Sequence, residues 1–135
     1  MVKSLCSFLT AALVVSFVAV PAQAYDFQAR YAELSVSSAE PLDRYTFEAE
    51  VINLGSNSVL VGPTVEFEYR KSGGVWTEFY SRLLPTMNSG VKRTFSREHS
   101  QSLRGTYSYR ACVTTVPGDT DPENNCSSPV SITIR

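Results

Sequence analysis

Three carboxylates near the C-terminus have the spacing of a loop that could hold a metal ion. Asp119, Asp121 and Glu123 stand at alternate positions, and Asn124 and Asn125 follow directly. Calcium takes about six to eight hard oxygen ligands, which acidic loops supply. The segment lacks the glycine that an EF-hand loop needs, and its ligand set is small. The favoured interpretation is a solvated polar turn whose side chains cap backbone amides, and a calcium site is the alternative.

A second candidate for chemistry is the aromatic segment that follows a glycine-rich turn. One register of this strand turns Val75 and Phe79 toward the core. The opposite face, Trp76, Glu78 and Tyr80, is then an exposed aromatic and acidic strip suited to stacking on a glycan or a peptide. The reversed register instead buries the tryptophan, which stabilises more per residue. Alternation alone leaves both registers open.

The sequence does not predict a catalytic site. The single histidine, His99, stands in a polar stretch that favours a solvated loop, and the chain has no G-x-S-x-G nucleophile elbow. Acidic pairs such as Glu48 and Glu50 lie on one strand face and indicate solubilising charge. We therefore expect no enzymatic activity and no cofactor.

The first 24 residues have the pattern of a secretory signal peptide. Lys3 precedes an apolar stretch over residues 8–20, and Ala22-Gln23-Ala24 supplies the small-x-small cleavage pattern. As a helix this stretch would rise only about 20 Å, short of a hydrocarbon core of about 30 Å, which disfavours a stable transmembrane span. We expect cleavage near Ala24 and a secreted or periplasmic bacterial domain over residues 25–135, with an uncleaved anchor as the alternative.

Composition limits the partners of this domain. The 135 residues are 43% hydrophobic and 19% charged, which fits one globular domain. The formal net charge is −1 and becomes −2 when Lys3 is lost with the signal segment. No basic stripe is present, so a nucleic-acid partner is not expected.

Two cysteines, Cys112 and Cys126, remain after the signal segment. An even pair in an exported protein is expected to be oxidised, and closing so short a loop stabilises the fold by about 3 kcal/mol. A metal site formed by the two thiolates would lack further ligands, because His99 is the only histidine. Alternation places Cys112 on the polar face, opposite Tyr109. We therefore expect a disulfide that lies outside the core and ties the last two strands together.

The elements that position these residues are short strands. Apolar and polar residues alternate over seven stretches, at 32–36, 45–51, 65–70, 75–81, 91–97, 107–114 and 130–134. Such alternation is typical of antiparallel sheets with one buried face. It predicts an all-β fold, a seven-stranded Greek-key β-sandwich like immunoglobulin or fibronectin type III domains, with a small barrel as the alternative.

The order of these signals resembles the CARDB domain of bacterial and archaeal surface and secreted proteins. Val51-Ile52-Asn53-Leu54-Gly55 is similar to the family's V-x-N-x-G, and residues 84–90 to its L-x-x-G turn. Gly105-Thr106-Tyr107 is similar to its G-x-Y, and residues 119–125 to its acidic loop ending in two asparagines. The resemblance implies a seven-stranded adhesion or binding module without catalytic residues.

These observations predict an exported, non-enzymatic immunoglobulin-like module that contacts a protein or glycan at the cell surface or in the periplasm. One alternative is a structural or assembly subunit that pairs with its partner through sheet edges. Another is a calcium-stabilised carbohydrate-binding module. The candidate contact face, Trp76, Glu78 and Tyr80, separates the first interpretation from the second.

Overall fold

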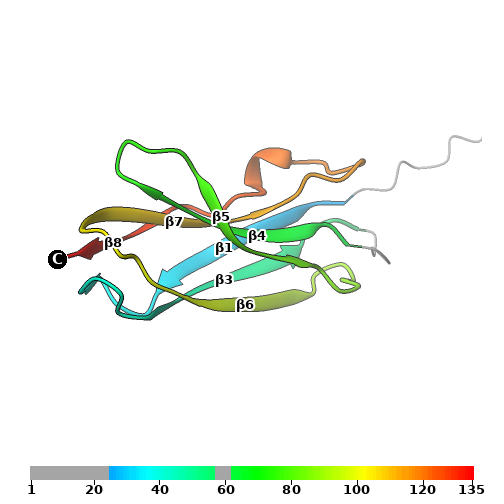
Figure 1. The fold of residues 1–135 in the computed structure, drawn as a ribbon. Coiled ribbons are helices and arrows are strands. Elements are labelled where there is room, and N and C mark those ends of the chain that lie inside the picture. Colours follow the sequence, from blue (N-terminus) through cyan, green and yellow to red (C-terminus); the bar gives the residue numbers. More distant parts are fainter. Residues whose placement is uncertain (1–24, 57–61) are drawn as a thin grey trace, which may run out of the picture.

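The fold is a sandwich of two β-sheets (Figure 1). The computed structural model describes residues 25–56 and 62–135, so the predicted signal segment lies outside the described residues. One sheet has three strands in the order β1 (Phe27–Leu34), β3 (Tyr45–Asn53) and β6 (Lys92–His99). The other has five strands, in the order β2 (Ser38–Ala39), β8 (Val130–Ile134), β7 (Gly105–Val113), β4 (Thr64–Lys71) and β5 (Thr77–Leu83). The predicted all-β sandwich is therefore confirmed, and the barrel alternative is wrong.

All seven predicted strands are present, and the described chain adds an eighth, β2. This strand has two residues and pairs in parallel with β8, which is too short for alternation to reveal. The first strand also begins earlier than the predicted range 32–36, because Phe27 and Ala29 are buried within β1. Its register shifts between Arg30 and Glu33, where Tyr31 has a φ of 50°. Alternation is broken at that point.

The core lies between the inward faces of β3 and β7. Tyr45, Phe47, Ala49 and Val51 of β3 are all buried, as the alternation predicts. The inward residues of β7, β4 and β8 are buried with them: Tyr107, Tyr109, Ala111, Val113, Val65, Phe67, Ile132 and Ile134. Burial of these alternating apolar side chains is the main force that holds the sheets together.

A buried amide fixes the end of β3. Asn53 is fully buried, and its side chain donates a hydrogen bond to the carbonyl of Met87 (3.1 Å) and accepts one from the N–H of Gly55 (3.0 Å). Met87 and Leu84 are themselves buried in the core, although they precede β6 in a segment outside the strands. The asparagine of the V-x-N-x-G segment thus holds this connection against the sandwich, which satisfies a polar group that would otherwise be costly to bury.

The disulfide joins Cys112 of β7 to Cys126, which precedes β8. Cys112 is buried and Cys126 is exposed. Cys112 stands opposite Glu66 on the outer face of the five-stranded sheet, and neither cysteine belongs to the apolar cluster between the sheets. The expected position outside the core is therefore confirmed. The enclosed loop contains a short 3₁₀ helix, η1 (Pro122–Asn124). No helix among the described residues has the length and apolar character needed to cross a membrane.

Candidate functional site

The local geometry of β5 decides where the aromatic segment points. In its pairing with β4, Tyr80 stands opposite Phe67 and Glu78 opposite Glu68, so Phe79 is an extra residue between the two pairs. Such a bulge disrupts the alternation and bends the strand. As a result both Phe79 and Tyr80 pack against the core, with the rings of Tyr80 and Phe67 5.2 Å apart.

Because of the bulge, neither of the two registers that alternation left open describes this segment. Tyr80 lies on the inner side, so the predicted strip of Trp76, Glu78 and Tyr80 is not one continuous face. Val75 is 82% exposed and precedes β5, so the prediction that it faces the core is wrong. The reversed register is wrong as well, because Trp76 is half-buried and does not belong to the core.

Trp76 instead lies among arginines on the outer face of the five-stranded sheet. Its ring centroid is 4.5 Å from the guanidinium carbon of Arg70 and 4.3 Å from that of Arg110. Both distances are typical of cation–π contacts. We call the surface formed by Glu68, Arg70, Trp76, Glu78 and Arg110 the Trp–Arg face.

Charges of both signs alternate beside the tryptophan. Arg110 of β7 donates a hydrogen bond from Nε to Oε2 of Glu68 on β4, at 2.6 Å, and both side chains are largely shielded from solvent. Burial raises the pKa of the neighbouring Glu66, and the nearby carboxylates of Glu78 and Glu68 raise it further. The face therefore combines an aromatic ring, two cations and a group of acids on a rigid sheet.

The structure also corrects the interpretation of His99, which is not in a solvated loop. It is the last residue of β6, pairs with Tyr45 and is half-buried. Its ring stacks on Phe79 at 4.2 Å, and its Nδ1 lies 2.9 Å from the Tyr109 hydroxyl. Burial lowers the pKa of His99. The polar residues around His99 in the sequence predicted a loop. They belong to a strand all the same, because β6 is an edge strand and most of its side chains are exposed.

The Tyr109 hydroxyl is the centre of a hydrogen-bond cluster between the sheets. It lies 2.6 Å from the Tyr45 hydroxyl and accepts a hydrogen bond from Nε2 of Gln101 at 3.1 Å. Burial raises the pKa of both tyrosines, so they stay neutral and serve as hydrogen-bonding groups. Alternation predicts that both tyrosines face inward, but it gives no sign of their contact with His99.

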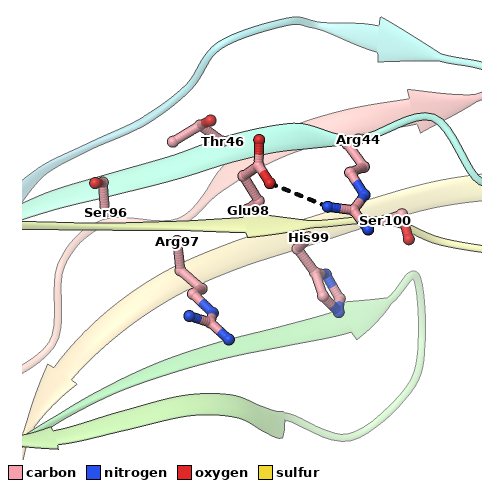
Figure 2. Close-up of a pocket in the computed structure, with 7 residues that line it drawn as sticks. All are labelled: Arg44, Thr46, Ser96, Arg97, Glu98, His99 and Ser100. Atoms are coloured by element: carbon pink, nitrogen blue, oxygen red, sulfur yellow. Dashed lines mark hydrogen bonds and ion pairs between the residues drawn. The ribbon is translucent and has the colours of Figure 1, made fainter.

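A surface depression of about 660 Å³ lies beside His99 (Figure 2). Arg44 and Glu98 form an ion pair across it at 3.3 Å, and both side chains are mostly exposed. Figure 2 shows Arg97 and His99 pointing toward the strands of the other sheet, whereas Glu98 lies on the opposite side of β6. The residues that line the depression are Arg44, Thr46, Ser96, Arg97, Glu98, His99 and Ser100. Arg97 and His99 leave β6 on one side and Glu98 on the other, so these side chains do not converge on one reacting atom.

The carboxylates of the acidic loop engage neighbouring donors. Oδ1 of Asp119 accepts a hydrogen bond from the N–H of Asp121 at 3.1 Å, and its Oδ2 accepts one from Nδ2 of Asn125 at 3.0 Å. Asn124 donates to Asp121 at 3.4 Å, and Glu123 lies exposed in η1. Within residues 25–56 and 62–135, no three His, Cys, Asp or Glu side chains are grouped to hold a metal ion.

Comparison with solved structures shows what the fold is similar to. The CARDB domain of a Pyrococcus furiosus protein, in complex with di-metal ions, matches 83% of this chain and 94% of its own, with 16% identity and a TM-score of 0.63. A β-glucosidase from Erythrobacter marinus matches 82% of this chain and 16% of its own, with 14% identity and a TM-score of 0.64. An alkylpurine DNA glycosylase from Pseudomonas fluorescens, bound to DNA with an abasic site analogue, matches 82% and 30%, with 10% identity and a TM-score of 0.59.

At these identities the comparisons establish the fold alone. No family model and no curated protein matches the chain. The chain has an immunoglobulin-like β-sandwich similar to that of a CARDB domain, so the resemblance predicted from the sequence motifs is confirmed at the level of the fold. In the β-glucosidase and the glycosylase, the matching region is a small part of a larger protein.

Proposed function

We propose that this chain is a non-enzymatic binding module whose Trp–Arg face contacts a protein partner. The single observation that carries the proposal is the position of Trp76, outside the core and in contact with the guanidinium groups of Arg70 and Arg110. Tryptophan and arginine are enriched among the residues that dominate binding energy at protein interfaces. Arg70 and Arg110 stand on the paired strands β4 and β7. Their contacts with Trp76, which directly precedes β5, order its ring before binding, which lowers the entropy cost of association.

The chemistry of the face favours a protein over a glycan. The Trp76 ring already contacts two guanidinium groups, which leaves less of its aromatic surface for stacking on a sugar ring. Alternating cations and carboxylates suit a partner surface with complementary charges, which sets the specificity and rate of association. A glycan remains the alternative ligand that the experiment below distinguishes.

A location outside the cytoplasm is part of the same proposal. The Cys112–Cys126 disulfide supports it, because disulfides persist in oxidising compartments such as the periplasm and the extracellular space. We propose that a signal peptide is cleaved near Ala24 and that the domain acts at the cell surface or in the periplasm. Mass analysis of the protein recovered from a periplasmic extract tests the cleavage site.

The binding proposal is tested by replacing the tryptophan. The wild-type domain and the Trp76→Ala variant are immobilised, proteins captured from a cell-envelope extract are identified, and the affinity of the purified partner is measured. We expect Trp76→Ala to weaken binding by about 30-fold or more, corresponding to about 2 kcal/mol.

A matched control removes an apolar side chain elsewhere. Leu103 is 65% exposed, so Leu103→Ala should leave the partner's affinity unchanged. Equal binding by wild type and Trp76→Ala would contradict the proposal. A glycan-array signal that Trp76→Ala abolishes, without a protein partner, would favour the glycan alternative.

A further inference from the structure

On the side of the sandwich where β5 and β6 lie, the inner faces of the two sheets are only partly shielded from solvent. Each of these strands is the last in its sheet, and the two are not hydrogen-bonded to each other. The inward residues Val65 and Phe67 of β4 are fully buried. On the neighbouring strand Tyr80 is only half-buried, and Arg82 is exposed. The three-stranded sheet therefore buries the inner face of the five-stranded sheet at β4 but only partly at β5.

Arginines point inward along this same side. Arg82 of β5 stands opposite the buried Val65, so it shares the inner face of its sheet. On β6, Arg93 stands opposite Val51 and Arg97 opposite Phe47, and both of those partners are fully buried. Residues directly opposite in an antiparallel pair lie on the same face. We call Arg82, Arg93 and Arg97, with the edge of β6, the arginine edge.

The guanidinium groups of these arginines form no ion pair within the described residues, so each can bind an anionic ligand. The guanidinium carbon of Arg97 lies 5.5 Å from the centroid of the Tyr80 ring. Figure 2 shows the Arg97 side chain pointing toward the strands of the other sheet. The ion pairs within the described part of the chain are Arg30–Glu50, Arg44–Glu98 and Arg110–Glu68, so none involves the arginine edge. Guanidinium groups bind carboxylates through two parallel hydrogen bonds when such a partner is supplied.

From this arrangement we propose that the arginine edge binds an extended acidic peptide segment of a partner protein, which adds a strand beside β6. An edge strand offers unpaired backbone N–H and C=O groups to an incoming strand. Alternate acidic side chains of the peptide would face Arg93 and Arg97, and the added strand would continue the three-stranded sheet on the β5 side. This surface is separate from the Trp–Arg face, and the inference does not rest on the proposed function.

Charge decides against a second copy of this chain as the occupant. Antiparallel pairing of β6 with another β6 would bring Arg93 and Arg97 of one copy against the same arginines of the other. Like charges placed directly opposite destabilise a strand pair. Inward-pointing charges on edge strands oppose self-association in the same way. The edge thus disfavours its own copy and accepts an acidic strand.

The test uses a fluorescent peptide of eight residues that alternates glutamate and valine, a length that matches β6. Fluorescence anisotropy measures its affinity for the full domain at low and at physiological salt. We expect binding that weakens with salt, and none by the matched lysine–valine peptide. A peptide methylated at alternate backbone nitrogens keeps its charge but cannot form the ladder, and it should bind at least tenfold more weakly. Equal affinity of the methylated peptide would overturn strand addition.

Protein variants separate this edge from other surfaces. Each single variant, Arg93→Glu and Arg97→Glu, should weaken binding, and the double variant should lose at least tenfold in affinity. Arg135→Glu, the same charge change as either single variant but placed beyond β8, should stay within twofold. Trp76→Ala should not alter binding of this peptide, which distinguishes the inference from the proposed function. Unchanged affinity of the double variant would contradict the proposal.

A readout on the wild-type protein removes any dependence on the folding of the variants. Hydrogen exchange of the β6 amides should slow when the acidic peptide is bound. Unchanged exchange, or slow exchange in a peptide-free dimer detected by sedimentation, would overturn the assignment of a peptide as the occupant.

Discussion

At the scale of single residues, environment rather than type decides what a side chain does. Trp76 is the largest apolar side chain of the domain, yet it lies on the outer face and contacts two guanidinium groups. His99 is surrounded by polar residues in sequence, yet it is packed on Phe79 and the Tyr109 hydroxyl. Both placements depend on contacts with residues far away in the sequence, which a residue's immediate neighbours do not reveal.

Replacing Trp76 should therefore cost less than replacing a core residue. We expect Trp76→Ala to lower the free energy of unfolding by about 1–2 kcal/mol, because each exposed cation–π contact contributes about 0.5–1 kcal/mol. Urea denaturation measures this change in the free energy of unfolding. In the native protein, a soluble quencher should partly quench the fluorescence of Trp76. A loss of about 3–5 kcal/mol would indicate a core position instead.

The burial of His99 predicts a pH dependence of stability. Its pKa is lower in the folded protein than the usual 6.5, so the unfolded state binds a proton more readily. The contribution of neutral His99 is complete above that value and is lost as the pH falls below it toward the folded pKa. The stability advantage of wild type over His99→Gln should therefore shrink as the pH falls below the ordinary histidine pKa of 6.5. An NMR titration giving a pKa of 6.5 or above would contradict this.

At the scale of the elements, alternation predicted the strands whose pairing is regular and failed where it is not. β3, β7 and β8 have the inward residues that the sequence indicates. β5 carries a bulge at Phe79, and β1 shifts its register beside Tyr31. A one-residue insertion depends on the partner strand and leaves no periodic trace in the sequence. The face of Trp76 could not be predicted for this reason, whereas the position of Cys112 could.

The Cys112–Cys126 disulfide joins β7 to the segment before β8, and its removal should destabilise the domain. Cys112→Ser should lower the free energy of unfolding by about 2–4 kcal/mol without changing the fold, because the unfolded chain regains the freedom of an open loop. Chemical denaturation and circular dichroism measure the two effects, and Cys126→Ser is the matched variant. Non-reducing mass analysis of periplasmic protein should show no free thiol in the mature domain, and two free thiols would refute the pairing.

At the scale of the whole molecule, the two sheets of the sandwich place its two candidate surfaces in different parts of the domain. The Trp–Arg face lies on the outer side of the five-stranded sheet, and the arginine edge lies where β5 and β6 end their sheets. Neither requires the acidic loop, which is positioned by its own hydrogen bonds. The fold is shared with proteins of different activities, so function is argued from these surfaces.

The thermal stability of the whole domain should be nearly independent of calcium. The carboxylate of Asp119 already accepts hydrogen bonds from Asp121 and Asn125, so we expect millimolar calcium to leave the melting temperature nearly unchanged. A site occupied at 100 times its Kd would add about 2.7 kcal/mol. Differential scanning fluorimetry measures the shift. A rise of several degrees that Asp121→Asn abolishes would show that the loop binds the ion.

The Cys112–Cys126 bond also encloses the whole exposed loop with η1 in one covalent ring. A protease that cuts between these cysteines would nick the chain without releasing β8, because the fragments stay linked through sulfur. The nicked protein should migrate as one band on a non-reducing gel and as two after reduction. In a compartment rich in proteases, a cut in this loop would therefore leave β8 covalently attached to the rest of the sandwich.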